Sequence, residues 1–151
     1  MRFRIHSAIV VLLGLLAVPA ECQEPSYFRH DHGVARDEQP LPADFSTDAK
    51  QLWRTPLPPG HSSPCVCGDS IFLTTFLADE KELATVALDR ATGGLRWKKV
   101  VPTKSIEPFH NTGSPATATP ACNGKQVFSF FGSYGLLCYD LDGNLLWEKA
   151  M

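Results

Sequence analysis

Two stretches of the sequence share one pattern: ALDRATGGLRW at residues 87–97 and CYDLDGNLLW at residues 138–147. In both, a β-type run ends in an Asp, a Gly follows within a short turn, and a Trp ends the copy. The Asp side chain can accept hydrogen bonds from backbone N–H groups of the turn, and Gly supplies the positive φ that the turn needs. The pattern therefore predicts two copies of a strand–turn–strand unit.

The residues before each copy are also repeated: PCVCGDSIF at residues 64–72 matches PACNGKQVF at residues 120–128. Each begins with a Pro, whose missing N–H is tolerated best at the head of a strand. A two-residue turn containing Gly then leads into β-branched and aromatic residues. This arrangement is typical of a β-hairpin.

Together the repeated segments predict four strands in each unit. The expected strands are 62–67, 70–76, 82–89 and 95–100 in the first unit, and 117–123, 126–131, 135–140 and 145–149 in the second. Trp53 ends a similar run without the rest of its unit, so tryptophans recur at intervals of 44 and 50 residues. Four-stranded antiparallel units repeated every ~40–50 residues are typical of a β-propeller. We therefore expect an all-β fold of about two blades, at about 60–100 and 114–151.

The first 20 residues have the features of a secretory signal peptide. Arg2 and Arg4 give a positive start, residues 8–18 are apolar throughout, and small residues precede a cut expected after Ala20. A membrane span needs about 20 residues, so an uncleaved anchor is the less favoured alternative. We expect export to the periplasm or the cell exterior and no membrane span in the mature chain.

Residues 21–50 are polar and acidic and are expected to form an extended linker before a partial propeller at 51–151. A lipoprotein is disfavoured because Glu21, not a small residue, precedes Cys22. The cluster at residues 30–32, His-Asp-His, could ligate a metal, but such a cluster in a tail is more often solvated. We predict no metal site.

Composition excludes some classes of protein. The chain has a net charge of −2, which becomes −4 when Arg2 and Arg4 are cut away, and it has no long basic run. A dedicated nucleic-acid binder is therefore disfavoured. The hydrophobic fraction of 44% also excludes a disordered chain.

All five cysteines follow the expected cut, and they stand at positions 22, 65, 67, 122 and 138. Disulfides are possible after export, and an odd number leaves at least one thiol without an intrachain partner. Cys65 and Cys67 would share one face of a strand with their Cα atoms about 6.6 Å apart, near the limit for a bridge. No Cys or His follows at zinc-finger spacing, so we favour a structural role for this pair and leave the disulfide pairing open.

Residues 87–97 resemble the tryptophan-docking motif of PQQ-type propeller repeats. The motif positions are held by Ala87, Asp89, Thr92, Gly93 and Trp97. Such repeats occur in quinoprotein dehydrogenases and in the scaffold lipoprotein of outer-membrane β-barrel assembly. Further segments that resemble exported PQQ-binding-like propeller proteins are 60–64, 68–75 and 131–140.

The second copy of this motif is degraded. Asp140, Gly143 and Trp147 are retained, but Cys138 replaces Ala, and Thr-Gly is reduced to an Asp-Gly pair. The resemblance implies that each Trp packs against the adjacent blade and fixes the angle between blades. Trp97 and Trp147 are therefore expected to be structural rather than ligand-binding.

Propellers have four to eight blades, so the resemblance also implies that the chain is the N-terminal part of a longer propeller. Two blades alone would leave open sheet edges. We expect those edges to be covered by the remaining blades of a parent protein or by self-association. The isolated mature chain is then expected to be marginally stable or oligomeric.

The best candidate site is a pair of loops that lead into the expected inner strands. His61 and Ser62 precede the first, and His110 and Asn111 precede the second. Two imidazoles at one mouth of a propeller channel could bind an anion or a metal, or move a proton. The alternative is that both are solvated loop residues. A Ser-His-Asp hydrolase site is disfavoured, because no Gly-x-Ser-x-Gly elbow is present.

Two functions compete. We favour a binding or scaffold module of the cell envelope that acts on a protein partner or a small ligand and has no catalytic residues. The alternative is an N-terminal fragment of a PQQ-dependent alcohol or sugar dehydrogenase. PQQ is implied only by the resemblance, and the chain has neither the adjacent Cys-Cys pair nor the Cys-x-x-Cys-His haem site of that class.

Overall fold

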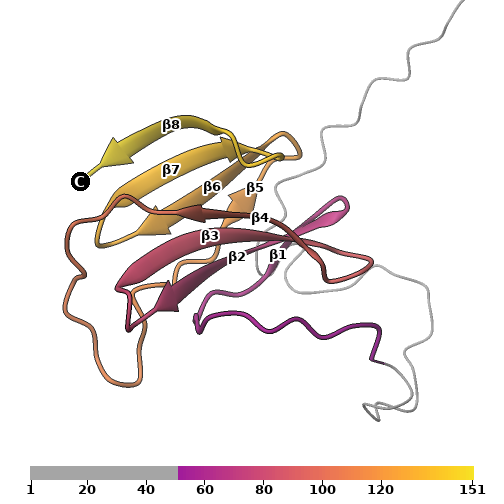
Figure 1. The fold of residues 1–151 in the computed structure, drawn as a ribbon. Coiled ribbons are helices and arrows are strands. Elements are labelled where there is room, and N and C mark those ends of the chain that lie inside the picture. The colour runs from indigo at the N-terminus through magenta and orange to yellow at the C-terminus, as the bar shows by residue number, and fades with distance from the viewer. Residues whose placement is uncertain (1–50) are drawn as a thin grey trace, which may run out of the picture.

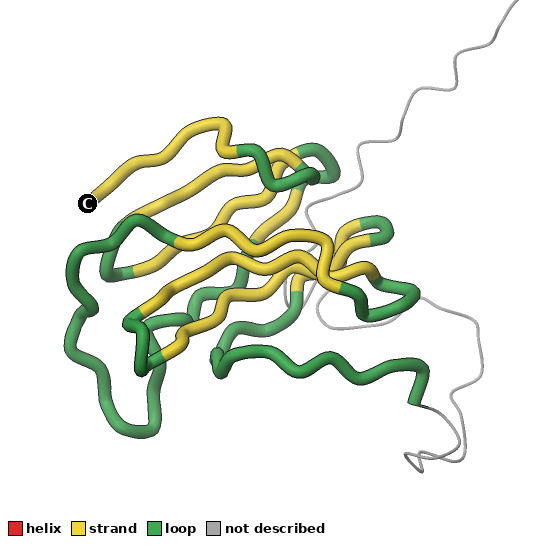
Figure 2. Tube along the Cα trace, in the orientation of Figure 1, coloured by secondary structure: helices red, strands yellow, loops and turns green. Residues whose placement is uncertain are grey.

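The computed structural model describes residues 51–151, which form strands, turns and loops without a helix. The strands are β1 (Cys65–Cys67), β2 (Ser70–Leu77), β3 (Glu82–Asp89), β4 (Leu95–Val100), β5 (Ala121–Cys122), β6 (Gln126–Phe131), β7 (Gly135–Asp140) and β8 (Leu145–Ala150). They make two four-stranded antiparallel sheets in the orders β1-β2-β3-β4 and β5-β6-β7-β8 (Figures 1 and 2). The predicted all-β fold with two blade-like units is confirmed. The predicted signal peptide and linker, with the histidines at 30 and 32, lie outside the described residues.

Both sheets follow the sequence repeat closely, including its irregularity. The third and fourth strands of each sheet pair with a register shift, between Ala87 and Leu88 in the first and between Cys138 and Tyr139 in the second. As a result Trp97 pairs with Ala87, and Trp147 pairs with Cys138. The degraded second copy of the motif therefore keeps the register of the first.

Two strands are shorter than predicted. The first begins at Cys65 rather than at residue 62, and the fifth covers Ala121 and Cys122 rather than 117–123. The residues in front of them use side-chain oxygens in place of a backbone ladder: the Ser63 N–H, for example, donates to the Thr119 Oγ1 at 3.1 Å. These segments stay extended but are not strands.

The core lies between the two sheets. One buried cluster joins Phe76 and Leu83 of the first sheet to Phe131, Leu137 and Tyr139 of the second. β3 is buried along almost its whole length because it has a neighbour on both edges and a sheet above it. By contrast, every residue of β8 is exposed. Hydrophobic burial therefore holds the two blades together and leaves one outer face uncovered in the described chain.

A disulfide between Cys67 and Cys122 links β1 to β5 across the two blades, with the Cα atoms 6.3 Å apart. Cys65 and Cys67 do not bridge each other. The Cys65 thiol is buried beside this disulfide and takes no part in it. Cys67 thus forms a cross-blade bond that the spacing left open.

Within residues 51–151 no helix has the length and apolar character needed to cross a bilayer.

Candidate functional site

The first predicted loop lies along β2. The Phe76 N–H donates to the Pro59 carbonyl at 2.7 Å, and the Thr74 N–H donates to the Ser62 Oγ at 3.0 Å. The Ser62 oxygen therefore holds the loop on the strand, in the place of a backbone acceptor. The neighbouring His61 side chain is exposed.

This loop meets the segment that leads into β5. The His61 N–H donates to the Ala116 carbonyl at 2.9 Å, and the Thr74 Oγ1 donates to the Ala118 carbonyl at 3.2 Å. The backbone of the first loop is thus fixed to the second blade, while its imidazole stays available to solvent.

His110 lies in a separate, tight turn. The Gly113 N–H donates to the His110 carbonyl at 2.8 Å. The Thr112 N–H is 3.3 Å from Nδ1 of His110, and the Thr112 hydroxyl is 2.8 Å from the same nitrogen. Nδ1 of His110 is thus engaged within its own turn. Asn111 is exposed at the tip of this turn. Among the described contacts, no hydrogen bond joins the two imidazoles.

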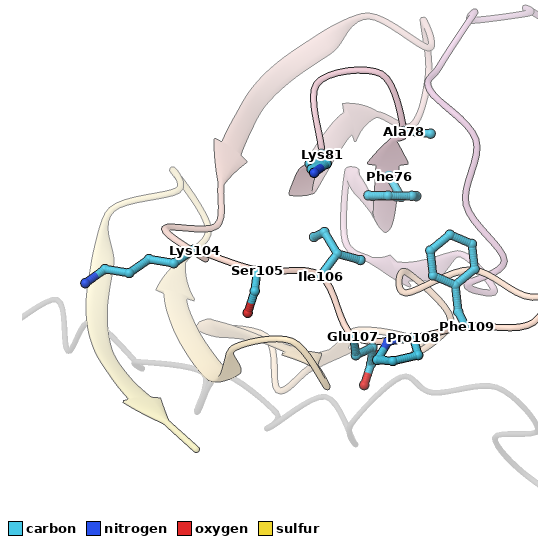
Figure 3. A pocket seen from close by; sticks show the side chains of 9 residues that line it. All are labelled: Phe76, Ala78, Lys81, Lys104, Ser105, Ile106, Glu107, Pro108 and Phe109. Carbon is cyan, nitrogen blue, oxygen red and sulfur yellow. The ribbon is translucent and has the colours of Figure 1, made fainter.

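A recess of about 590 Å³ opens beside the second loop (Figure 3). Its lining residues are Phe76, Ala78, Lys81, Lys104, Ser105, Ile106, Glu107, Pro108 and Phe109. Phe76 and Phe109 meet edge to face, with ring centroids 5.6 Å apart. The recess therefore has an apolar floor, supplied by β2 and by the loop between the blades, and its charged lining residues are Lys81, Lys104 and Glu107.

The loop that lines this recess is anchored on the second blade. The Thr103 hydroxyl donates to the Ser133 carbonyl at 2.9 Å, and the Glu107 N–H donates to the Ser133 Oγ at 3.0 Å. Ile106 packs against the core cluster between the sheets. The recess is thus built between the blades rather than by a free loop.

This recess was not predicted from the sequence. The available signal was the apolar run of Ile106, Pro108 and Phe109 within a connection that otherwise has no strand pattern. Exposed apolar residues in a connecting loop commonly mark a binding surface. Phe76, which lines the opposite side of the recess, lies 30 residues before Ile106 in the chain. Only the folded structure brings it beside this run.

The recess does not offer PQQ, the cofactor that the resemblance made possible, two parallel aromatic faces, because Phe76 and Phe109 are inclined at 83°. In the described part of the chain no group of three or more His, Cys, Asp or Glu is placed to hold a metal ion.

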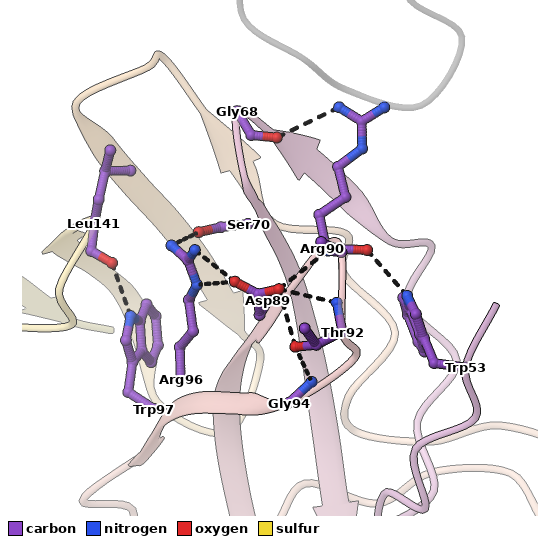
Figure 4. Close-up of polar contacts among 11 residues, drawn as sticks. Trp53, Gly68, Ser70, Asp89, Arg90, Thr92, Gly94, Arg96, Trp97 and Leu141 are labelled. Carbon is purple, nitrogen blue, oxygen red and sulfur yellow. Dashed lines mark hydrogen bonds and ion pairs between the residues drawn. The ribbon is translucent and has the colours of Figure 1, made fainter.

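Three of the predicted docking residues, Asp89, Thr92 and Trp97, lie at one turn and make polar contacts there (Figure 4). The Asp89 Oδ1 accepts from the backbone N–H groups of Ala91 and Thr92, and Asp89 Oδ2 pairs with Arg96 at 2.7 Å. The contacts with Arg96 and Thr92 lower the pKa of Asp89 to about 2. Gly93 closes the turn with a φ of 71°.

Trp97 leaves this turn to contact the other blade. Its indole N–H donates to the Leu141 carbonyl at 2.8 Å, and its ring centroid lies 5.7 Å from that of Tyr139. The ring also covers Gly143, where the backbone φ is 82°. Trp147, at the same place in β8, contacts Phe128 of its own blade and is 43% exposed.

A comparison with protein families identifies the repeat. A family model described as outer membrane protein assembly factor BamB, built on the PQQ-type repeat, matches residues 34–151. This match confirms the resemblance drawn from residues 87–97. No curated protein matches the chain.

Proposed function

Because the chain belongs to the PQQ-repeat family described as outer membrane protein assembly factor BamB, we propose that it is an exported binding or scaffold module of the cell envelope. The fold by itself does not specify a reaction. Two blades joined by a shared core and a disulfide are well suited to hold a partner. We place no catalytic step on this chain.

The observation that carries the proposal is the recess beside Phe109. Its apolar floor would take one apolar side chain, and its two lysines, Lys81 and Lys104, against the one carboxylate of Glu107, would favour a partner with a nearby carboxylate. We therefore propose that the occupant is an extended peptide segment that carries an apolar residue next to an acidic one.

The predicted loop residues have distinct roles in this proposal. His61 and His110 are exposed but do not line the recess, so they would contact the partner outside it, and Asn111 would contribute an amide from the turn of His110. Ser62 would act indirectly, because its oxygen holds the first loop on β2. Partner binding should therefore weaken when both histidines are replaced by alanine.

A library of synthetic peptides that pair one apolar residue with one carboxylate tests this site. Binding is measured by fluorescence polarisation for the wild type, for Phe109→Ala and for Phe130→Ala. The two phenylalanines are similarly exposed, at 48% and 42%, but only Phe109 lines the recess. We expect Phe109→Ala to weaken the best peptide at least tenfold, a loss of about 1.4 kcal/mol. Equal effects of both variants, or no peptide that binds, would rule the recess out.

The dehydrogenase alternative has its own test. The protein is incubated with PQQ and Ca²⁺, and alcohol oxidation is followed with a redox dye. A binding module is expected to give no dye reduction above the protein-free control. Turnover that depends on the added PQQ would replace the scaffold proposal by an enzyme.

Export is tested by the intact mass of the protein released from an exporting host. Cleavage after Ala20 should give a chain that begins at Glu21. Retention of residues 1–20 in the purified protein would instead support an uncleaved anchor.

A further inference from the structure

Three of the cysteines lie together in one buried cluster. Cys65 and Cys67 come from β1, and Cys122 comes from the neighbouring inner strand β5 (Figure 1). Residues i and i+2 of a strand point to the same face, so both cysteines of β1 point toward β5. The cluster thus holds one disulfide, Cys67–Cys122, and the thiol of Cys65.

The Cys65 sulfur lies beside Cys122. Burial raises the pKa of the Cys65 thiol, and a hydrogen bond from the backbone of Cys122 offsets part of this rise. Cys65 and Cys122 are each only 1% exposed. Cys65 is therefore shielded from reagents in the solvent, while a disulfide lies within its own cluster.

The other sulfur of the disulfide belongs to a residue at an open recess. Cys67 is 9% exposed and lines a recess of about 430 Å³. The rest of the lining is Gly68, Asp69, Ser70, Arg96, Gly124, Leu141 and Asp142. A small molecule in this recess would meet Cys67 but not Cys65, which is not part of the lining.

Cys122 is placed to change its partner without a change of strand pairing. The Gly124 N–H donates to the Cys122 Sγ at 3.3 Å, which holds this sulfur in the cluster. A bridge to Cys65 instead of Cys67 makes the closed loop only two residues longer, and loop closure depends weakly on length. A bridge between Cys65 and Cys67 would instead span about 6.6 Å between Cα atoms, near the upper limit. Cys122 is thus the sulfur that both favourable bridges share.

We propose that the Cys67–Cys122 disulfide exchanges with the Cys65 thiol, and that Cys67 is thereby released as a modification site for small thiol-reactive electrophiles. The Cys65 sulfur attacks Sγ of Cys122 and forms the new S–S bond. The bond between Cys122 and Cys67 breaks, its electron pair stays on the Cys67 sulfur, and the proton lost by Cys65 ends on Cys67. One disulfide and one thiol are present before and after, so no oxidant or reductant is needed.

The exchange moves the thiol of the cluster from a buried position to an accessible one. Before it, the thiol is that of Cys65, and after it, the thiol is that of Cys67 at the wall of the recess. Since the reactivity of a cysteine depends on access as well as on its thiolate fraction, the released Cys67 is the more reactive of the two. An electrophile that captures Cys67 also blocks the return, so the shifted bridge accumulates.

Alkylation of the folded, oxidised protein without a reductant tests the exchange. The chain carries Cys22→Ser, which removes a thiol outside the described residues. It is incubated with iodoacetamide, whose iodide leaves as the sulfur takes up the carboxamidomethyl group, and labelled and bridged peptides are identified by mass spectrometry. We expect label on Cys67 and a bridge between Cys65 and Cys122. Label on Cys65 with the Cys67–Cys122 bridge intact, or no label on either cysteine of β1, would overturn the proposal.

Two further cysteines provide matched controls in the same background. Cys65→Ser removes the attacking sulfur and keeps the bridge, so labelling of Cys67 should fall at least tenfold. Cys138 is a buried thiol outside this cluster and reports on opening of the second blade, so Cys67 should be labelled at least tenfold faster than Cys138. Equal rates at Cys67 and Cys138, or undiminished labelling of Cys67 in Cys65→Ser, would contradict the exchange.

A second variant tests the shifted bridge itself. Cys67→Ser keeps Cys65 and Cys122, and with oxidised glutathione it should form the Cys65–Cys122 bridge. Cys65→Ser, oxidised in the same way, should form the Cys67–Cys122 bridge, and circular dichroism checks that both variants are folded. A folded Cys67→Ser that stays unbridged, under conditions in which Cys65→Ser is bridged, would show that Cys65 does not reach Cys122 and would also overturn the proposal.

Discussion

Asp89 and Asp140 organise equivalent turns with different neighbours. Each carboxylate accepts backbone N–H groups of its own turn. Asp89 also pairs with Arg96, whereas Asp140 accepts from the side-chain amide of Asn144 at 2.8 Å. The sequence predicted both Asp roles from the position before the turn. It gave no reason to expect that Asn144 takes the place of Arg96 on Oδ2, because an amide four residues away meets the carboxylate only once the turn has formed.

The lowered pKa of Asp89 makes stability depend on pH. Hydrogen bonds from Arg96 and Thr92 lower this pKa from 3.8 to about 2. Ionised Asp89 therefore stabilises the fold above about pH 4, and the contribution is lost as pH falls towards 2. In urea unfolding, the midpoint of Asp89→Asn should lie below that of the wild type near neutral pH, and the difference should close between about pH 4 and pH 2.

Asp140→Asn serves as the comparison, since the pKa of Asp140 is also lowered but by Asn144 and not by a cation. Added salt should narrow the Asp89→Asn difference and leave the Asp140→Asn difference nearly unchanged. A difference at Asp89 that does not change with pH would show that its ionisation does not matter to the fold.

At the scale of elements, the ends of most strands were predictable within one residue, because the same pattern occurs twice in the sequence. Two strands were not. β1 and β5 are short since Ser62 and Thr119 replace ladder bonds by side-chain bonds to a different segment. The recess was missed for the same kind of reason: Phe76 and Phe109 belong to different elements, and no local period relates them.

A comparison of two glycines tests the contact between the Trp97 indole and the turn beneath it. Gly124 and Gly143 have nearly the same φ, 83° and 82°, but only Gly143 lies under an indole. Alanine would be strained to the same extent at either position because the backbone φ is nearly equal. The difference in unfolding free energy between the two variants therefore measures the steric clash with Trp97. We expect Gly143→Ala to lower the free energy of unfolding by about 1–3 kcal/mol more than Gly124→Ala, in urea denaturation. Equal losses would mean that the ring does not need the glycine.

At the scale of the molecule, the two blades are held by burial between the sheets, by an indole and by one covalent bond. The Cys67–Cys122 disulfide joins residues 55 apart in sequence and links the innermost strands of the two blades. Cysteine count and spacing did not predict this pairing, because it depends on how one blade sits on the next.

Reduction of this disulfide should therefore weaken the whole molecule. Closing a loop of this size restricts the unfolded chain and contributes about 2–4 kcal/mol. Urea unfolding with a phosphine reductant should show that loss relative to the oxidised protein. The variant Cys67→Ser/Cys122→Ser should be insensitive to the reductant, and wild-type protein that behaves likewise would contradict a stabilising link.

The central claim is that successive blades are joined by an indole seated on a glycine turn. The most direct measurement is a nuclear Overhauser spectrum that resolves the glycine α-protons. Gly93 should show contacts to the ring of Trp53 and Gly143 to the ring of Trp97, whereas Gly68 and Gly124, which have open space around them, should show no contact to any indole. A Gly143 without a contact to Trp97, and indistinguishable in this respect from Gly124, would contradict the account.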